Sequence, residues 1–124
     1  MSGRLQWRRR GSAGPRPVRS IEIYLPLEDN DGRPIAESKY VRLQAELLRQ
    51  FGGVTSTQRQ FPLQGLWQAA GRVYQDRVVV FGVMDFRAVP SGPVIQYLER
   101  LKLRLKRQFV QLDVLITVQE LVAI

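Results

Sequence analysis

The sequence contains no cysteine and no histidine. Without cysteine, the chain can form no disulfide bond and offers no thiol nucleophile. Without histidine, it lacks the side chain that proteins use most often as a general base and as a metal ligand near neutral pH. Any catalysis would therefore depend on carboxylates, hydroxyl groups, lysine or arginine. We assign no catalytic residue from the sequence, and we predict no metal and no cofactor.

Long hydrophobic runs are also missing. No apolar segment approaches the roughly 20 residues that a transmembrane helix needs. No apolar stretch follows the N-terminal arginines, as it would in a secretory signal, so we expect a cytoplasmic protein. The 124 residues, of which 44% are hydrophobic and 24% charged, suit one soluble globular domain.

Acidic residues are absent from the N-terminal stretch. Residues 1–20 contain six arginines and no acid, so most of the net charge of +8 lies there. This stretch is rich in glycine and proline and has no apolar periodicity, which predicts a disordered arginine-rich tail over 1–20. A single domain is expected over 21–124. The tail is either a solvated leader or a binding segment for phosphate groups, through Arg8, Arg9 and Arg10.

The pattern of apolar residues predicts two helices. Over 36–51, Ala36, Tyr40, Leu43, Leu47 and Phe51 form one apolar stripe, and Gly52-Gly53 ends the helix. Off that stripe, Arg42 and Glu46 have the spacing of an ion pair within one helix. From about 91 to 109, Ser91 is expected to cap the helix. The buried stripe of this second helix is predicted to be Val94, Leu98, Leu101 and Leu105.

Four strands are predicted, and the third organises the fold. Residues 21–27 alternate apolar and polar, 54–61 reads as a polar edge strand, and 112–122 closes the chain. The third strand, RVYQDRVVVFGVMDF over 72–86, is apolar on both faces from Val78 to Met84, which is typical of a central strand. Gly82 indicates a bulge or a close approach of the backbone.

The element order strand–helix–strand–strand–helix–strand predicts a ferredoxin-like α+β fold. In this fold two helices cover one face of a four-stranded antiparallel sheet, and the first and third strands are central. The other face stays open, and the apolar residues expected there would form a large exposed patch. We therefore expect a homodimer that packs sheet against sheet. The alternative is that the tail or a ligand covers this face.

Three sequence blocks suggest a relationship. Phe51-Gly52-Gly53-Val54-Thr55, then Gly65-Leu66-Trp67, then the segment 71–76 follow one another along the chain. The pattern resembles small, uncharacterised bacterial proteins with FGG(V/L)T, GxW and GxVYxD blocks in a ferredoxin-like arrangement. The resemblance covers roughly residues 21–122. It implies the fold and no activity.

The best candidate ligand site lies at the start of the central strand. Tyr74 and Asp76 have the same parity, so their side chains point the same way. Nearby tryptophan and arginine residues could complete a site for a small anionic or aromatic ligand, or an acid–base pair. The alternative is that Asp76 simply pairs with an arginine and the tryptophan covers the core. The candidate residues are Arg59, Trp67, Arg72, Tyr74 and Asp76.

The leading hypothesis is a non-enzymatic, homodimeric binding or regulatory module. The second helix offers an alternative, because five cations crowd its surface beside one acid, Glu99. This face is either a solvated surface or, with the tail, a nucleic-acid-binding surface through Arg100, Arg104 and Arg107. A further alternative is a histidine-free enzyme that works through Tyr74 and Asp76.

Overall fold

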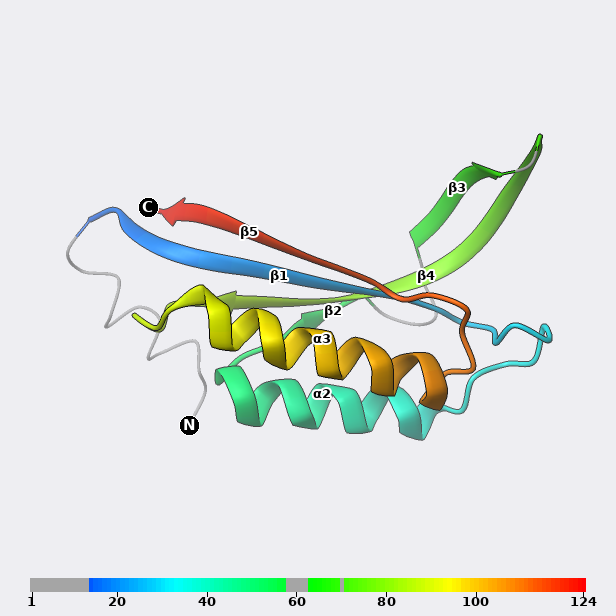
Figure 1. The fold of residues 1–124 in the computed structure, drawn as a ribbon, viewed down its shortest axis with the longest axis horizontal. Coiled ribbons are helices and arrows are strands. Elements are labelled where there is room, and N and C mark those ends of the chain that lie inside the picture. Colours follow the sequence, from blue (N-terminus) through cyan, green and yellow to red (C-terminus); the bar gives the residue numbers. More distant parts are fainter. Residues whose placement is uncertain (1–13, 58–62, 70) are drawn as a thin grey trace.

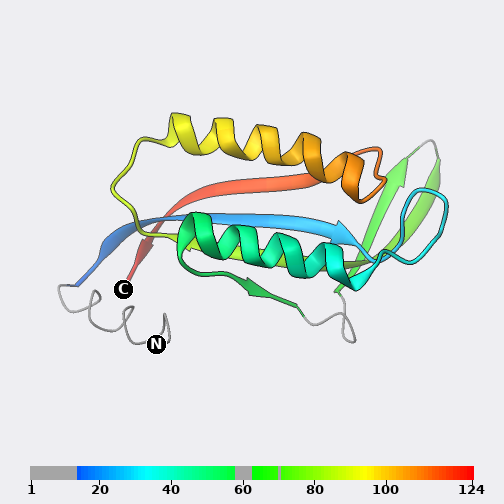
Figure 2. The same cartoon turned by 90° about the horizontal axis from the view of Figure 1, so that it is seen from below.

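The computed structural model describes residues 14–57, 63–69 and 71–124, with 63–69 and 72–76 described by their backbone alone. Two helices lie side by side on one face of an antiparallel sheet (Figures 1 and 2). In chain order, the elements are β1 (Arg16–Pro26), α2 (Glu37–Phe51), β2 (Thr55–Ser56), β3 (Leu63–Ala69), β4 (Arg72–Asp85), α3 (Ser91–Gln108) and β5 (Leu115–Ala123).

The sheet has the strand order β2-β4-β1-β5, and β3 also pairs with β4. Neighbouring strands are antiparallel throughout, with β1 and β4 in the centre. This arrangement confirms the predicted ferredoxin-like α+β fold. No helix among the described residues is long and apolar enough to cross a membrane.

The core lies between the helices and the sheet. Ile21 pairs with Val83 and Ile23 with Phe81, and all four side chains are buried toward the helices. Burying a side chain of this size contributes about 1.5–3 kcal/mol, so this layer supplies much of the stability. The predicted stripe of α3 is confirmed, because the core cluster includes Val94, Leu98, Leu101 and Leu105. The predicted stripe of α2 is confirmed at Tyr40, Leu43 and Leu47. At its ends, Phe51 is only partly buried, and Ala36 is exposed at the position before the helix.

The predicted start of the first strand is wrong. β1 begins at Arg16, so residues 16–20 belong to the sheet and not to a disordered tail. Arg16 pairs with Ala123, and Arg19 pairs with both Asp85 and Glu120. Pairing with β5 along residues 16–20, and with β4 from Arg19 onward, forms the strand despite its polar composition. The tail arginines Arg8, Arg9 and Arg10 lie outside the described residues.

The predicted strand over 54–61 is only partly found. β2 comprises Thr55–Ser56, and residues 58–62 lie outside the described part of the chain. A further strand, β3, pairs with β4 over seven residues. β3 and the first half of β4 form an arm that extends beyond the helices (Figure 1).

Three local features were predicted from single residues. Gly52 ends α2 in the left-handed conformation with φ 81°, and its N–H donates to the carbonyl of Leu48, as predicted. At Gly82 an added methyl group would lie 3.1 Å from Thr55 Oγ1, which confirms a close approach. Ser91 is not the cap of α3: Pro90 holds that position, and no side chain caps the helix. The hydroxyl of Ser91 instead accepts a hydrogen bond from Arg19 and donates one to Glu120.

The open face of the sheet is more polar than the sequence suggested. Because Ile21 and Ile23 face the helices, the alternate residues Glu22 and Tyr24 face away. Tyr24 lies between Val80 on β4 and Leu115 on β5, and Glu22 lies beside Thr117. Exposed apolar side chains remain on this face at Met84 (43%) and Leu115 (56%). The apolar patch is therefore divided by polar residues.

Candidate functional site

The predicted cluster around Tyr74 lies on the β3–β4 arm. Trp67 is the register partner of Tyr74, Gly65 that of Asp76, and Ala69 that of Arg72. The backbone thus brings four of the five predicted residues onto one hairpin. Arg59 lies outside the described residues. In Figure 1 this arm projects away from both helices, and two other places in the molecule form concave polar sites.

The first concave site is a groove between α2 and α3, here called the basic groove. It encloses about 550 Å³ and passes over the buried side chains of Leu43 and Leu105. Five cationic side chains and one carboxylate line it: Lys39, Arg42, Arg49, Arg104, Arg107 and Glu46. Its charge is therefore strongly positive.

Glu46 crosses the groove to α3. Its two carboxylate oxygens accept hydrogen bonds from Arg104 at 3.0 and 2.6 Å, and Oε2 also accepts one from the Tyr97 hydroxyl at 2.5 Å. The Arg104 hydrogen bonds outweigh burial and lower the pKa of Glu46. Burial and the adjacent carboxylate raise the pKa of Tyr97. The expected Arg42–Glu46 ion pair is wrong, because the fork of Arg104 matches both carboxylate oxygens.

The remaining cations of the groove form no close ion pair with a carboxylate of the described residues. Lys39 donates to the carbonyl of Gln108 at the end of α3, where a cation also suits the helix dipole. Within the described residues, no carboxylate lies within ion-pair distance of Arg42, Arg49 or Arg107. Arg49 still helps to lower the pKa of Glu46 at longer range, so Arg42 and Arg107 are the arginines most open to an external anion.

The predicted nucleic-acid residues of α3 are thus partly brought together. Arg104 and Arg107 line the groove, while Arg100 is exposed on α3 and is not part of the lining. The sequence missed the three cations from α2. Their positions off the apolar stripe were visible, but their proximity to α3 follows only from the packing of the two helices.

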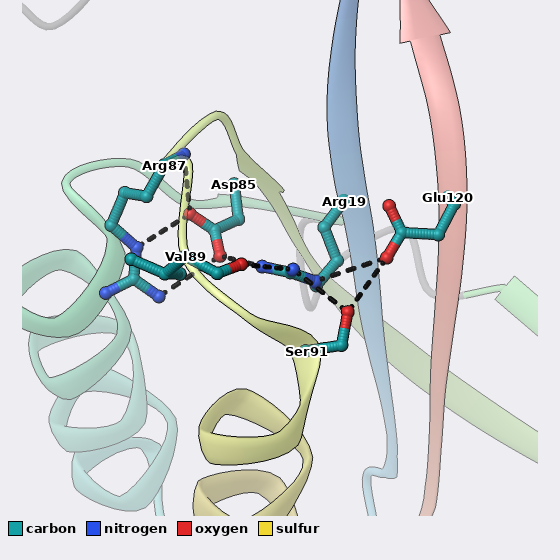
Figure 3. Close-up of polar contacts among 6 residues, drawn as sticks. All are labelled: Arg19, Asp85, Arg87, Val89, Ser91 and Glu120. Atoms are coloured by element: carbon teal, nitrogen blue, oxygen red, sulfur yellow. Dashed lines mark hydrogen bonds and ion pairs between the residues drawn. The ribbon is translucent and has the colours of Figure 1, made fainter.

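The second concave site, here called the polar pocket, lies at the start of α3 (Figure 3). It encloses about 530 Å³ between the first residues of β1, the end of β4, the loop 86–90 and β5. Three arginines and two carboxylates line it together with apolar side chains. The charged residues are Arg16, Arg19, Asp85, Arg87 and Glu120.

Asp85 is held on two sides. Arg87 donates to its two oxygens at 2.7 and 3.1 Å, and Arg19 donates to Oδ2 at 2.9 Å. Burial alone would raise the pKa of Asp85, but the hydrogen bonds from Arg87 and Arg19 keep this pKa below its ordinary value. The Arg87 guanidinium also lies 4.9 Å from the ring centre of Phe51, in a cation–π contact.

Arg19 connects the strands to α3. One of its terminal nitrogens binds Asp85, and the other donates to the carbonyl of Val89 and to Ser91 Oγ at 3.0 and 3.1 Å (Figure 3). The sequence reasoning missed this network, because it placed Arg19 in the tail. Alternation counted backward from Ile21 would have found it, since Arg19 and Asp85 both fall on the inward side of their strands.

Metal binding by carboxylates has no support in the described residues. No group of three carboxylates gathers at a distance suitable for one ion in that part of the chain.

No protein-family model and no curated protein sequence matches this chain. Solved structures with the same fold do match. A phage SAM lyase in complex with S-methyl-5′-thioadenosine has 16% identity and a TM-score of 0.63, over 83% of this chain and 81% of the lyase. A phage SAM lyase in the apo state gives 16% and 0.62, over 82% and 79%. At this identity, the likeness establishes the shared fold.

Proposed function

We propose that this chain is a non-enzymatic, homodimeric binding domain that holds nucleic acid in the basic groove. The observation that carries the proposal is the imbalance of charge in the groove, where five cations surround one carboxylate. Glu46 is already neutralised by Arg104, so the positive potential of the other residues is directed at the solvent. Nucleic-acid backbones are the abundant polyanions that such a surface attracts.

The shape of the groove also favours a chain-like ligand. α2 has 15 residues and α3 has 18, so two roughly parallel walls of about 22–27 Å border the groove. Phosphates recur every 3.4 Å along a DNA strand, and several can therefore lie along these walls. Arginine suits this role because its planar guanidinium can bind two phosphate oxygens together.

Salt dependence tests the proposal. Binding of a mixed-sequence DNA duplex should weaken with salt, with a log–log slope of about −3 if three phosphates meet Arg42, Arg49 and Arg107. The double variant Arg42→Glu, Arg107→Glu should reduce the steepness of that slope by about 2 and weaken binding to every sequence similarly. Fluorescence anisotropy over a salt series measures both quantities.

A matched control separates the groove from the overall charge. Arg33→Glu changes the charge of one exposed arginine in the loop between β1 and α2, outside the groove. It should leave the slope close to that of the parent protein. Equal losses in the Arg33→Glu protein and in an Arg42→Glu single variant would contradict a specific role for the groove.

A second candidate function is supported by the fold comparison. The matched phage protein is a SAM lyase with bound S-methyl-5′-thioadenosine, and the match covers most of both chains. A histidine-free enzyme would need groups such as the tyrosine and carboxylate at Tyr74 and Asp76. Trp67, the register partner of Tyr74, supplies an aromatic residue type suited to a purine ring. We therefore propose a SAM-consuming enzyme as the alternative.

Chromatography of the products decides this alternative. Incubation with SAM should release S-methyl-5′-thioadenosine, and the Tyr74→Phe, Asp76→Asn variant should lose that release. The control variant Tyr24→Phe, Asp113→Asn makes the same chemical changes at residues outside the arm and should retain it. Circular dichroism verifies that both variants fold. No release by the parent protein, or equal release by both variants, would dismiss the alternative.

A further inference from the structure

The polar pocket has an unused hydrogen-bond donor at its centre. Arg19 is only 6% exposed, and its Nε–H has no hydrogen-bond acceptor although both terminal nitrogens are engaged. Glu120 Oε1 lies 3.5 Å from this nitrogen, close enough for an ion pair, but it forms no hydrogen bond with it. A buried donor without an acceptor is costly, which makes this position favourable for a ligand oxygen.

The start of α3 adds further donors to the same place. The cap position is Pro90, no side chain caps the helix, and no acidic residue lies in its first turn. The first N–H groups of this helix therefore have no side-chain acceptor from its own cap, and no acidic residue of α3 itself offsets the positive end of the helix dipole. Pro90 and Ser91 both line the pocket. Oxyanions bind readily at such helix ends.

Glu120 shows where such an oxyanion fits. Its Oε1 accepts a hydrogen bond from Ser91 Oγ at 3.1 Å while facing Arg19 Nε (Figure 3). The Glu120 side chain is 66% exposed on the edge strand β5, so it can swing into solvent with little loss of packing. A ligand oxyanion can replace this carboxylate between Ser91 and Arg19.

The charges of the pocket permit this exchange. Asp85 is neutralised by its contacts with Arg19 and Arg87. Arg16 adds a third positive charge, with its guanidinium 4.2 Å from the ring centre of Phe86. The three arginines already outnumber the two carboxylates, and this excess of positive charge grows when the Glu120 carboxylate leaves.

The pocket walls indicate the rest of the ligand. Apolar side chains complete the lining, and the volume of about 530 Å³ lies within the range of small-molecule sites. The apolar lining residues are Pro17, Val18, Phe86, Ala88, Val89 and Pro90. We propose that the polar pocket binds a small organic oxyanion, a carboxylate or a phosphate monoester, which displaces Glu120 from Arg19 and Ser91.

Glu120→Gln tests the displacement directly. Removing the competing charge should tighten binding about two- to fivefold, which corresponds to the strength of one exposed ion pair. The probes are acetate, benzoate and inorganic phosphate, each titrated while the Arg19 Nε–H and Gly92 amide signals are followed by NMR. Benzoate binding more tightly than acetate supports a carboxylate with an apolar body, and phosphate binding most tightly supports a phosphate ligand.

Glu99→Gln is the matched control. It removes the same charge from an exposed position of α3 outside the pocket. It should leave the affinities close to those of the parent protein. Equal affinities in the two variants, or titrations that do not move the Arg19 and Gly92 signals, would overturn the proposal. Ser91→Ala should weaken binding severalfold, and unchanged affinity in that variant would also count against it.

Discussion

Arg19 and Asp85 form an ion pair that is almost completely withdrawn from water. Burying two charges costs several kcal/mol for each ion, and this cost is offset only where hydrogen bonds satisfy both groups. Arg87 supplies the additional hydrogen bonds to Asp85, and Val89 and Ser91 accept those of Arg19. The network thereby fixes the end of β4 and the loop before α3 relative to β1.

Asp85→Asn should destabilise the protein by about 3–5 kcal/mol, because it removes the buried counter-ion of Arg19 and leaves only the exposed Glu120 carboxylate at 3.5 Å. Urea unfolding followed by circular dichroism measures this loss. Asp113→Asn is the control, since Asp113 pairs with Lys102 at 3.1 Å on the surface and should contribute about 0–1 kcal/mol. If the two losses are equal, the backbone and hydroxyl acceptors alone are enough to hold Arg19.

The same variant gives a pH dependence with a defined sign. The pKa of Asp85 is lower in the folded protein than in the unfolded chain, where it is about 3.9. Its contribution is therefore complete above that value and is lost as the pH falls through the lower folded pKa. Below about pH 4, the stability of the parent protein should approach that of the Asp85→Asn variant, as measured by unfolding at successive pH values.

At the scale of elements, the sequence predicted those helices and strands in which the spacing of apolar residues matches the faces that are buried. Every residue of the predicted α3 stripe is buried, because a 3.6-residue period leaves one face for the core. The apolar character of β4 on both faces likewise indicated a central strand, and β4 lies between β1 and the strands β2 and β3. The fold class followed from these elements and their order.

Two features of the sheet could not be obtained from local pattern. Residues 16–20 have a tail-like composition, and they form strand because β5 pairs with all of them and β4 pairs with them from Arg19 onward. The β3–β4 arm is a second such feature, because it is defined by the pairing of two strands. The predicted site at Tyr74 depends on the same strand pairing, because the register of the hairpin places Trp67 opposite Tyr74.

The two concave sites required the packing of separate elements. Arg42 on α2 and Arg107 on α3 line one groove although 65 positions separate them. The polar pocket likewise joins the first residues of β1 to Glu120 near the end of the chain. The charge pattern of α3 indicated the cations on that wall of the basic groove. It could not show that Arg104 of α3, and not Arg42 of α2, is the counter-ion of Glu46, because that depends on how the two helices pack.

At the scale of the whole molecule, both helices cover one side of the sheet, so the two faces of the protein differ in character. The helix side carries the basic groove, while the open side carries Met84 and Leu115 among polar residues. A divided apolar surface suits a two-fold contact, in which polar and apolar residues of one copy meet those of the other. The proposed homodimer would thus leave both helix layers free for nucleic acid.

The double variant Met84→Lys, Leu115→Lys should weaken the proposed dimer by about tenfold or more, because four added charges would meet across the two-fold axis. Light scattering after size-exclusion chromatography, over a dilution series, measures the change in mass. Leu103→Lys is the control, since Leu103 is an equally exposed leucine on α3, away from the open face. It should leave the mass unchanged. A monomeric parent protein, or a dimer that survives in the double variant, would contradict sheet-to-sheet pairing and direct attention to the β3–β4 arm as the contact.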